Sequence, residues 1–314
     1  NNPVGESKYT GLIFVMPFVT GFILFGIYPF AMSFILSFTD SGINSSAEFI
    51  GIENFRRLLN DSDFHKAVAV TLKYILMLVP LKLIVSLGTA LLLNMNIKGM
   101  GFFRTVYYIP SILGSNIAIV IMWSFLFTSG GLVNQVLEKL GIMPVSWYGE
   151  STPAMFMIVL LRVWEFGSTM IIFLSALNDI PRELYDSARV DGAGKIRTFF
   201  SITLPMLRNV IFFKLVMQSI TAFQEFNAPF MITGGNPMKG TYTVSMLIYD
   251  EAFRYYDTGY ANAVSWVLFT MTALFVAVLF FVVGNFGNGF KHCKLCFKSH
   301  CKRELAAVLG IVEE

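Results

Sequence analysis

Six stretches of mostly apolar residues limit the fold of this chain more strongly than any other feature of its sequence. They run over residues 12–38, 67–93, 104–127, 153–177, 207–231 and 262–286. A helix needs roughly 20 apolar residues to cross a bilayer, and each stretch is long enough. The first exceeds the roughly 7–15 apolar residues of a signal peptide, so we interpret it as a membrane helix. Only 14% of the residues are charged, against about 25% in soluble domains. The sequence therefore predicts an all-α integral membrane protein with six transmembrane helices.

Lysine and arginine residues between the stretches predict the orientation, because cytoplasmic loops carry the excess of these residues. With the N-terminus placed inside, the inner segments hold thirteen, the outer loops hold six, and four lie within the stretches. An even number of spans puts both termini on one side, so both are predicted to be cytoplasmic. The net charge of +3 reflects this asymmetry, and we expect no nucleic-acid partner.

The chain is predicted to have three parts. Residues 1–66 would form an N-terminal segment, the first span and an outer loop, in which GIENFRRLLNDSDF has the apolar spacing of a short amphipathic helix. Residues 67–286 would form a core of five helices. A second short helix, LVNQVLEKLG, is predicted in the outer loop 129–152 and ends at Gly141. Residues 287–314 would form a basic cytoplasmic tail.

That tail contains every cysteine of the chain, in the segment KHCKLCFKSHC. Cys293, Cys296 and Cys301, with His292 and His300 beside them, have a spacing that zinc sites use. A zinc site needs four converging ligands, and the tail offers no second ligand pair, so we predict no metal. The interpretation that remains is a reduced basic tail, whose lysines anchor the last helix at the inner membrane surface.

The segment DSARVDGAGKIRTFFSITLP, residues 186–205, is unusual because it is charged and leads into an apolar stretch. A helix is predicted to start near Asp179, which can cap it, with Pro181 in its first turn. The glycines of DGAG break that helix. A second short helix, KIRTFFSITL, is expected to stop at Pro205. The result would be two short helices at an angle on the cytoplasmic surface.

This segment resembles the coupling-loop motif of the membrane subunits of ATP-binding-cassette (ABC) importers, which is E-A-A, three residues, G, nine residues, I, one residue, L-P. Residues 180–194 also match the longer sugar-permease motif I-P-x-E-L-Y-E-A-A-R-x-D-G-A-G, apart from aspartate at 186 and serine at 187. The resemblance implies a coupling loop over residues 179–206. Its ATPase-coupling residues would be Glu183, Asp186, Ser187, Ala188, Asp191, Gly192, Ala193 and Pro205.

The similarity covers roughly residues 10–285 and includes FIGIENFRRLL before the second span and AFQEFNAPFMITGGNP at the end of the fifth. In these segments the chain is similar to the sugar-permease branch of the maltose and glycerol-phosphate type. This resemblance implies a type I ABC importer permease fold in a bacterial inner membrane. The implied partners are membrane lipid, a second and different permease subunit, a dimer of ATPases, an extracytoplasmic solute-binding protein and a sugar. The chain itself would bind no cofactor, since the ATPases would use ATP and magnesium.

The chain is not predicted to be an enzyme. Its nearest approach to the phosphate-binding pattern G-x-x-x-x-G-K-[ST], residues 189–196, lacks both the first glycine and the Ser or Thr that would hold magnesium. The three histidines, His65, His292 and His300, fall outside the apolar stretches. A stand-alone secondary transporter or channel is the alternative function. It predicts inverted repeats and helices broken at the midplane, and the sequence gives no sign of either.

Polar residues inside the apolar stretches mark a candidate substrate pathway, because such residues are costly and generally face a bundle interior or water. Lys214, Gln218, Thr221 and Glu225 have the spacing of one helix face. The predicted pathway residues are Gln218, Thr221, Gln224, Glu225, Arg162, Trp164, Glu165 and Lys82. Two of them have simpler interpretations. Arg162 and Glu165 could form an i, i+3 ion pair, and Trp164 could pack in the bundle instead of stacking on a sugar ring.

Basic residues outnumber acidic residues inside the stretches. The basic residues are Lys73, Lys82, Arg162 and Lys214, and the acidic residues are Glu165 and Glu225. If this excess of positive charge lines the pathway, it would favour an acidic oligosaccharide over a neutral one. We therefore hypothesise that the imported sugar is acidic.

Overall fold

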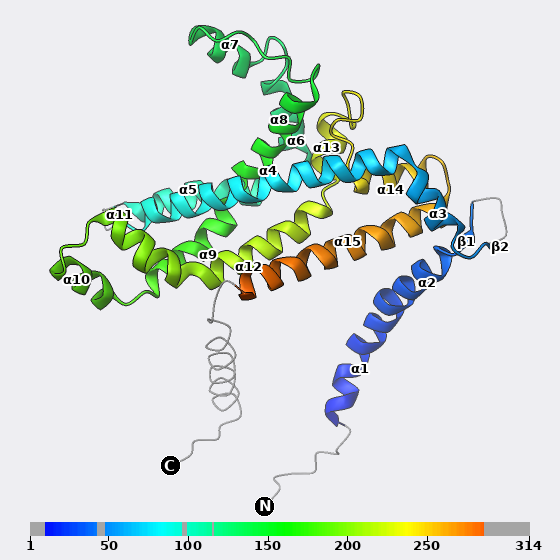
Figure 1. Cartoon of the computed structure of the whole chain (residues 1–314), viewed down its shortest axis with the longest axis horizontal. Coiled ribbons are helices and arrows are strands. Elements are labelled where there is room, and N and C mark those ends of the chain that lie inside the picture. The colour runs from blue at the N-terminus through cyan, green and yellow to red at the C-terminus, as the bar shows by residue number, and fades with distance from the viewer. Residues whose placement is uncertain (1–9, 43–47, 96–98, 115, 286–314) are drawn as a thin grey trace, which may run out of the picture.

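The structure is a computed structural model of the chain, and it describes residues 10–42, 48–95, 99–114 and 116–285 (Figure 1). The cysteine-containing tail, with both of its interpretations, lies outside these residues. The described part is mostly helical. Its elements are α1 (Thr10–Phe22), η1 (Ile23–Ile27, a π-helical turn), α2 (Tyr28–Leu36), β1 (Thr39–Asp40), β2 (Glu48–Phe49), α3 (Glu53–Asn60), α4 (Ser62–Leu93), α5 (Met100–Leu113), α6 (Ile117–Leu126), α7 (Leu132–Lys139), α8 (Ser151–Trp164), α9 (Gly167–Asn178), α10 (Arg182–Val190), α11 (Lys195–Thr198), η2 (Phe199–Thr203, a second π-helical turn), α12 (Leu204–Phe223), α13 (Asn227–Ile232), α14 (Val244–Phe253) and α15 (Thr258–Asn285).

Four helical segments of the described chain are long and apolar enough to cross a membrane. They are Phe14–Leu36, Ser62–Leu93, Lys195–Phe223 and Thr258–Val282. Two bent pairs of helices, α5 with α6 and α8 with α9, would bring the number of spans to six if each pair crosses once. The predicted first, second and sixth stretches thus correspond to continuous helices.

The first of these segments is anchored to the other helices at its C-terminal end, in α2. Phe30 and Phe34 of α2 pack on Trp266 of α15, with ring centroids 4.7 and 4.8 Å apart. Ser33 Oγ donates to Asn262 Oδ1 at 2.8 Å. Figure 1 shows α1 pointing away from the other helices. No residue in the most apolar part of the segment is buried, so its surface is free to contact lipid or another chain.

Helix α4 is the centre of the fold. It contacts α8, α9, α12 and α14. Asp61 caps its N-terminus by accepting a hydrogen bond from Asp63 N at 2.8 Å. Ala67, Tyr74 and Ala90 are fully buried along it. The helix continues through Pro80 to Leu93, and the other helices of the core are arranged around it.

The fourth predicted span is broken, which corrects the expectation of uninterrupted helices. α8 ends at Trp164, α9 begins at Gly167, and the two differ in direction by 48°. A side chain from α5 supports the break, since Ser111 Oγ donates to Glu165 O at 3.1 Å and accepts from Ser168 N at 2.9 Å. A methyl group on Gly167 would lie 2.5 Å from the Tyr107 carbonyl oxygen, so α5 can approach only a glycine there. The third predicted span is likewise divided, between α5 and α6.

The segment between α9 and α12 differs from its prediction in two ways. Asp179 does not cap the next helix, because it ends α9, and α10 starts after Pro181 without a side-chain cap. The second helix does not stop at Pro205, since the chain stays helical from Lys195 to Phe223. Proline normally clashes with the carbonyl four residues before it. Here Pro205 lies just after the π-helical turn η2, whose wider backbone accommodates the ring.

The loops that were predicted to lie outside contain the two predicted short helices, α3 and α7. Gly141 adopts a φ of +76° just beyond α7, as its predicted role as a terminator requires. Asn134 holds the loop of α7 together, because its amide donates to Ser129 O and Val145 O and accepts from Val145 N and Trp147 Nε1. The third outer loop contains α14, which was not predicted, and the fifth span ends at Phe223 rather than 231, because α13 is a separate helix.

Candidate functional site

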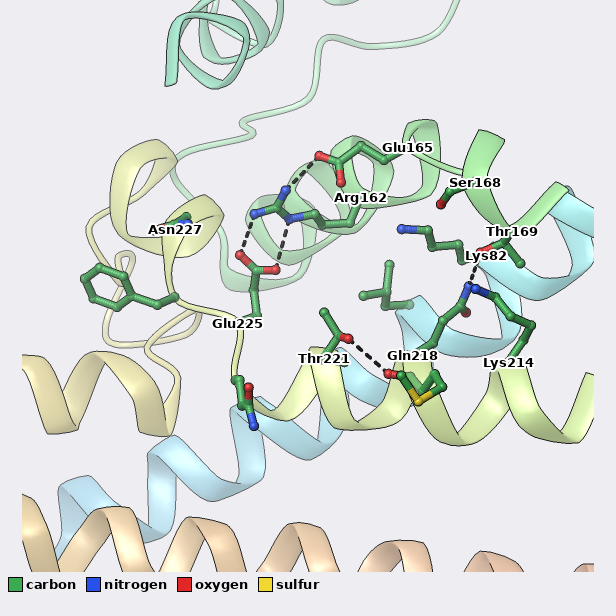
Figure 2. Close-up of a pocket in the computed structure, with 15 residues that line it drawn as sticks. Lys82, Arg162, Glu165, Ser168, Thr169, Lys214, Gln218, Thr221, Glu225 and Asn227 are labelled. Carbon is green, nitrogen blue, oxygen red and sulfur yellow. Dashed lines mark hydrogen bonds and ion pairs between the residues drawn. The ribbon is translucent and has the colours of Figure 1, made fainter. Parts of the chain in front are cut away.

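A polar cavity of about 540 Å³ lies between α4, the α8–α9 break, α12 and the start of α13 (Figure 2). Its lining residues are Leu78, Lys82, Arg162, Glu165, Ser168, Thr169, Lys214, Met217, Gln218, Thr221, Ala222, Gln224, Glu225, Phe226 and Asn227. All of the predicted pathway residues except Trp164 are among them. Sequence reasoning missed Ser168, Thr169 and Asn227. Ser168 and Thr169 could have been predicted, because they directly follow Gly167 in the segment EFGST, which interrupts the apolar stretch.

Arg162 joins the two carboxylates of the cavity. Its Nε and Nη2 donate to the two oxygens of Glu225 at 3.0 and 2.7 Å, and its Nη1 donates to Glu165 Oε1 at 2.7 Å. The predicted i, i+3 pair between Arg162 and Glu165 is therefore present. The two bonds to Glu225, from a different span, were not predicted. Because the three side chains are 9–15% exposed, these charge-assisted bonds lie largely away from solvent.

Glu225 also connects three pieces of backbone. Its Oε1 accepts a hydrogen bond from Ala228 N at 3.1 Å, which satisfies a free amide at the start of α13. Its carbonyl oxygen accepts from Thr243 Oγ1 at 3.0 Å. Arg162 and Glu225 thus tie the end of α8 to the junction of α12 with α13 and to the loop before α14.

The remaining polar groups of the cavity leave several hydrogen-bonding positions open. Gln218 Nε2 donates to Thr169 Oγ1 at 3.0 Å, but Gln218 Oε1 is buried and has no partner. Figure 2 shows the Lys82 side chain reaching from α4 into the cavity. Within the described residues, neither Lys82 nor Lys214 has an ion pair or a hydrogen bond. The cavity can therefore offer both cationic donors and an amide acceptor to a polar solute.

Trp164 faces away from this polar lining. Its ring packs on Trp123 with centroids 5.9 Å apart, and Trp123 in turn donates to Met157 O and packs on Phe127. Phe223 of α12 is buried against Phe275, with ring centroids 5.3 Å apart. These aromatic rings pack between helices, and for Trp164 this was the simpler of the two interpretations drawn from the sequence.

The second candidate element is the pair of short helices α10 and α11. Gly192 separates them with a φ of +73°, and Ala193 N donates to Ala188 O at 2.9 Å to close the end of α10. Tyr185 OH is 3.1 Å from Thr203 Oγ1, which fixes α10 against η2. Figure 1 shows α10 at one extreme of the molecule.

The predicted coupling residues differ in exposure. Ala188 is buried, Ala193 is half-buried, and Glu183, Asp186, Ser187, Asp191, Gly192 and Pro205 are exposed. Asp186 forms a solvent-exposed pair with Arg189 at 3.6 Å. Two apolar side chains beside them, Val190 and Ile196, are 89% and 77% exposed. A rigid element with this mixture of exposed charged and apolar side chains is suited to docking against another protein.

A separate polar network joins α3 to the N-terminal end of α15 and the segment around α14. Arg57 of α3 pairs with Asp257 at 2.6 Å, and its guanidinium lies 4.1 Å from the centre of the Tyr260 ring. Burial raises the pKa of the Tyr242 hydroxyl, which also donates to Asp250 Oδ2 at 2.8 Å. The network lies at the end of the molecule remote from α10 (Figure 1).

Comparison with known proteins assigns the fold and family. The sequence model of the family described as "Binding-protein-dependent transport system inner membrane component" matches residues 96–292. The probable ABC transporter permease protein YesP of Bacillus subtilis is 38% identical over 281 residues, which cover 88% of this chain and 91% of that protein. The trehalose/maltose transport system permease protein MalF of Thermococcus litoralis is 33% identical over 296 residues, which cover 91% of this chain and 98% of that protein.

The fold also matches a solved structure, that of a bacterial ABC transporter involved in the import of the acidic polysaccharide alginate. The TM-score is 0.75 at 23% sequence identity, with 87% of this chain and 94% of that chain covered. At this level of identity the likeness shows a shared fold. Among the residues that the structure describes, no group of three or more His, Cys, Asp or Glu side chains is placed to hold a metal ion.

Proposed function

Because this chain belongs to the family of binding-protein-dependent transport system inner membrane components, we propose that it is a transmembrane permease subunit of an ATP-driven sugar importer. The observation that carries the proposal is the family match over residues 96–292. Similarity to a trehalose/maltose permease along nearly the whole chain supports an oligosaccharide as the solute. An extracytoplasmic solute-binding protein would deliver the sugar, and this chain would form half of the pathway.

The proposed arrangement in the membrane has six spans, with each bent helix pair crossing once and both termini in the cytoplasm of a bacterial cell. The excess of lysine and arginine in the inner segments supports this orientation. It puts α10 and α11 inside the cell and the network around Arg57 outside. The cavity then lies between them, with Glu225 at its outer end and Lys214 nearer the cytoplasm.

The proposed coupling element is the loop 179–206, which would dock on a separate ATPase. Chain geometry supports a direct mechanical role, because the backbone from Lys195 to Phe223 is one continuous helical segment. A displacement of α10 and α11 would therefore move α12, and with it Gln218 and Thr221 in the cavity. A dimer of ATPases that closes on ATP and magnesium would rock this chain against a second permease subunit, which we take to be a different chain.

The pair between Arg162 and Glu225 has a specific place in this mechanism. It connects α8 to the α12–α13 junction at the outer end of the cavity. Opening the pathway to the outside would require these two spans to separate, so the pair would hold the outer end closed until the ATPases drive the transition.

A stand-alone transporter or channel is the other function considered. The break between α8 and α9 removes one argument against it, since broken helices are typical of secondary transporters. Family membership decides between the two, because the matching family consists of components of binding-protein-dependent systems.

The experiment that tests the proposed function is reconstitution of the purified complex in proteoliposomes. Sugar uptake should require ATP, the solute-binding protein and an ATPase that co-purifies with this chain. The double variant Gly192→Pro with Asp186→Lys should assemble in the membrane but abolish uptake. Uptake by the purified chain alone, or full uptake by the double variant, would refute the proposal.

A further inference from the structure

The two carboxylates of the cavity are both bound to Arg162. Glu225 accepts two hydrogen bonds from the guanidinium and one from Ala228 N, and Glu165 accepts one. Each nitrogen of the Arg162 guanidinium donates one hydrogen bond to a carboxylate oxygen, which uses three of its five N–H donors. The positive charge of Arg162 is therefore already shared between two carboxylates, which disfavours a further anion at its guanidinium.

The two lysines of the cavity are in a different state. Lys82 and Lys214 both line it, and within the described chain neither one is bonded to a carboxylate, a carbonyl or a hydroxyl. Each therefore keeps three N–H donors directed to whatever fills the cavity. Lys73, the remaining basic residue counted inside the spans, does not line the cavity. Its side chain is exposed, and its Nζ donates to Thr152 Oγ1 at 3.4 Å.

The charges of the cavity do not cancel. Three cations, Lys82, Arg162 and Lys214, line it together with two carboxylates, Glu165 and Glu225. An uncompensated charge is unfavourable where it is partly removed from water, and Lys82 and Lys214 are both half-buried. A solute with one negative charge would bring the total to zero, whereas a neutral solute would leave one positive charge uncompensated.

The other open groups of the cavity fit a sugar. The buried Gln218 Oε1 is an acceptor without a partner, which suits a hydroxyl group. Hydroxyls of Ser168 and Thr221 and the amide of Asn227 also border the space. A volume of about 540 Å³ falls in the usual range for small-molecule sites.

From these observations, and resting on the proposed function, we infer that the transported solute is a saccharide bearing a carboxylate, and that Lys82 is the specificity-determining residue that receives this carboxylate. Lys214 is the second cation, and it lies at the end of the cavity that is nearer the coupling loop 179–206. The two lysines are assigned because they line the cavity without a bonded partner. Arg162 is bonded to two carboxylates, and Lys73 lies outside the cavity lining.

The test uses the complete complex in proteoliposomes, with a panel of uronic-acid disaccharides and the neutral disaccharides obtained by reducing their carboxyl groups. Initial uptake rates are measured for the native complex and for the variants Lys82→Met, Lys82→Arg and Lys214→Met. Lys73→Met is the matched control, since it removes the same charge from α4 outside the cavity. ATPase activity and subunit composition of each complex are recorded to show that it is assembled.

The expected result is that the native complex takes up an acidic disaccharide and that Lys82→Met lowers this uptake by about 10-fold or more, the loss typical of one charge-assisted hydrogen bond. Lys82→Arg should retain most of the uptake, Lys214→Met should show a smaller loss, and Lys73→Met should stay near the native rate. Any neutral disaccharide that is transported should be little affected by Lys82→Met.

Three results would overturn the inference in distinguishable ways. ATP-dependent uptake of neutral disaccharides alone would refute the acidic substrate and leave the proposed function intact. An equal loss for neutral and acidic sugars in Lys82→Met, or an equal loss for acidic sugars in Lys82→Met and Lys73→Met, would show that Lys82 does not select the carboxylate. ATP-independent uptake would refute the proposed function itself.

Discussion

Replacing Glu225 with glutamine should destabilise the chain more than the same replacement at Glu165. Glutamine is nearly the same size but has one acceptor oxygen in place of two. It therefore loses one of the two charge-assisted bonds from Arg162 and directs an N–H against the guanidinium. Removing one partner of a buried ion pair costs about 3–5 kcal/mol. Because Arg162 keeps Glu165, we expect the lower end of that range, about 3 kcal/mol.

The matched control is Glu165→Gln, which affects a single hydrogen bond to the same guanidinium. Its expected cost is about 1.5 kcal/mol, because glutamine can still accept one bond but without the charge. The assay is thermal unfolding of the purified chain in detergent. At about 2–4 °C per kcal/mol, the melting temperature should fall by about 6–12 °C for Glu225→Gln and by about half as much for Glu165→Gln.

The coupling between Arg162 and Glu225 can be isolated with Arg162→Met and the double variant. Arg162→Met leaves both carboxylates without their counter-ion, and Glu225→Gln leaves Arg162 with Glu165 alone. The double variant should therefore be more stable than the sum of the single losses predicts. An interaction energy near zero would refute the reasoning, because it would mean that water already screens the pair. Equal effects of Glu225→Gln and Glu165→Gln would contradict the bidentate geometry.

Three further substitutions test other parts of the structure. Gly192→Ala forces an alanine into a φ of +73° at a cost of about 1–2 kcal/mol. Because this strain distorts the proposed coupling loop, solute-stimulated ATPase activity of the complex should fall. Gly194→Ala, at a φ of −68°, should leave that activity unchanged. Gly167→Val places a side chain against the backbone of α5 and should cost about 1–3 kcal/mol in thermal unfolding, whereas Gly88→Ala, with open space around it, should be neutral or stabilising. Asn134→Ala leaves Val145 N and Trp147 Nε1 without their acceptor, at a cost of about 2 kcal/mol. Protease cleavage within residues 129–150 should therefore become faster in right-side-out vesicles.

Several features of the structure follow from short-range patterns, and these are the ones that sequence reasoning predicted. Gly192 separates two short helices because glycine adopts a positive φ at little cost, whatever the remainder of the chain does. The amphipathic spacing of α3 and α7 likewise sets the local structure of each segment. Lys214, Gln218 and Thr221 line one cavity because helical spacing puts them on one face of α12.

The features that were missed depend either on a backbone irregularity or on partners distant in the sequence. The continuity of the helix through Pro205 depends on the π-helical turn before it, which no periodicity of apolar residues encodes. The bond between Arg162 and Glu225 joins residues 63 positions apart. An i, i+3 pair could be proposed from spacing alone, but this one required knowledge of how α8 and α12 pack.

The cavity and the helix breaks are best understood as one feature. A helix that ends inside a membrane leaves backbone groups without partners, and lipid cannot satisfy them. At the end of α8 the side chain of Ser111 bonds both Glu165 O and Ser168 N. At the end of α12 the carboxylate of Glu225 binds Ala228 N, and Thr243 Oγ1 binds Glu225 O. The side chains that satisfy these breaks are polar, and the space around them is the cavity. Polar residues in the fourth and fifth stretches therefore mark where the helices end. A charged residue next to a short gap in apolar periodicity is the signal that could have predicted both the helix breaks and the cavity.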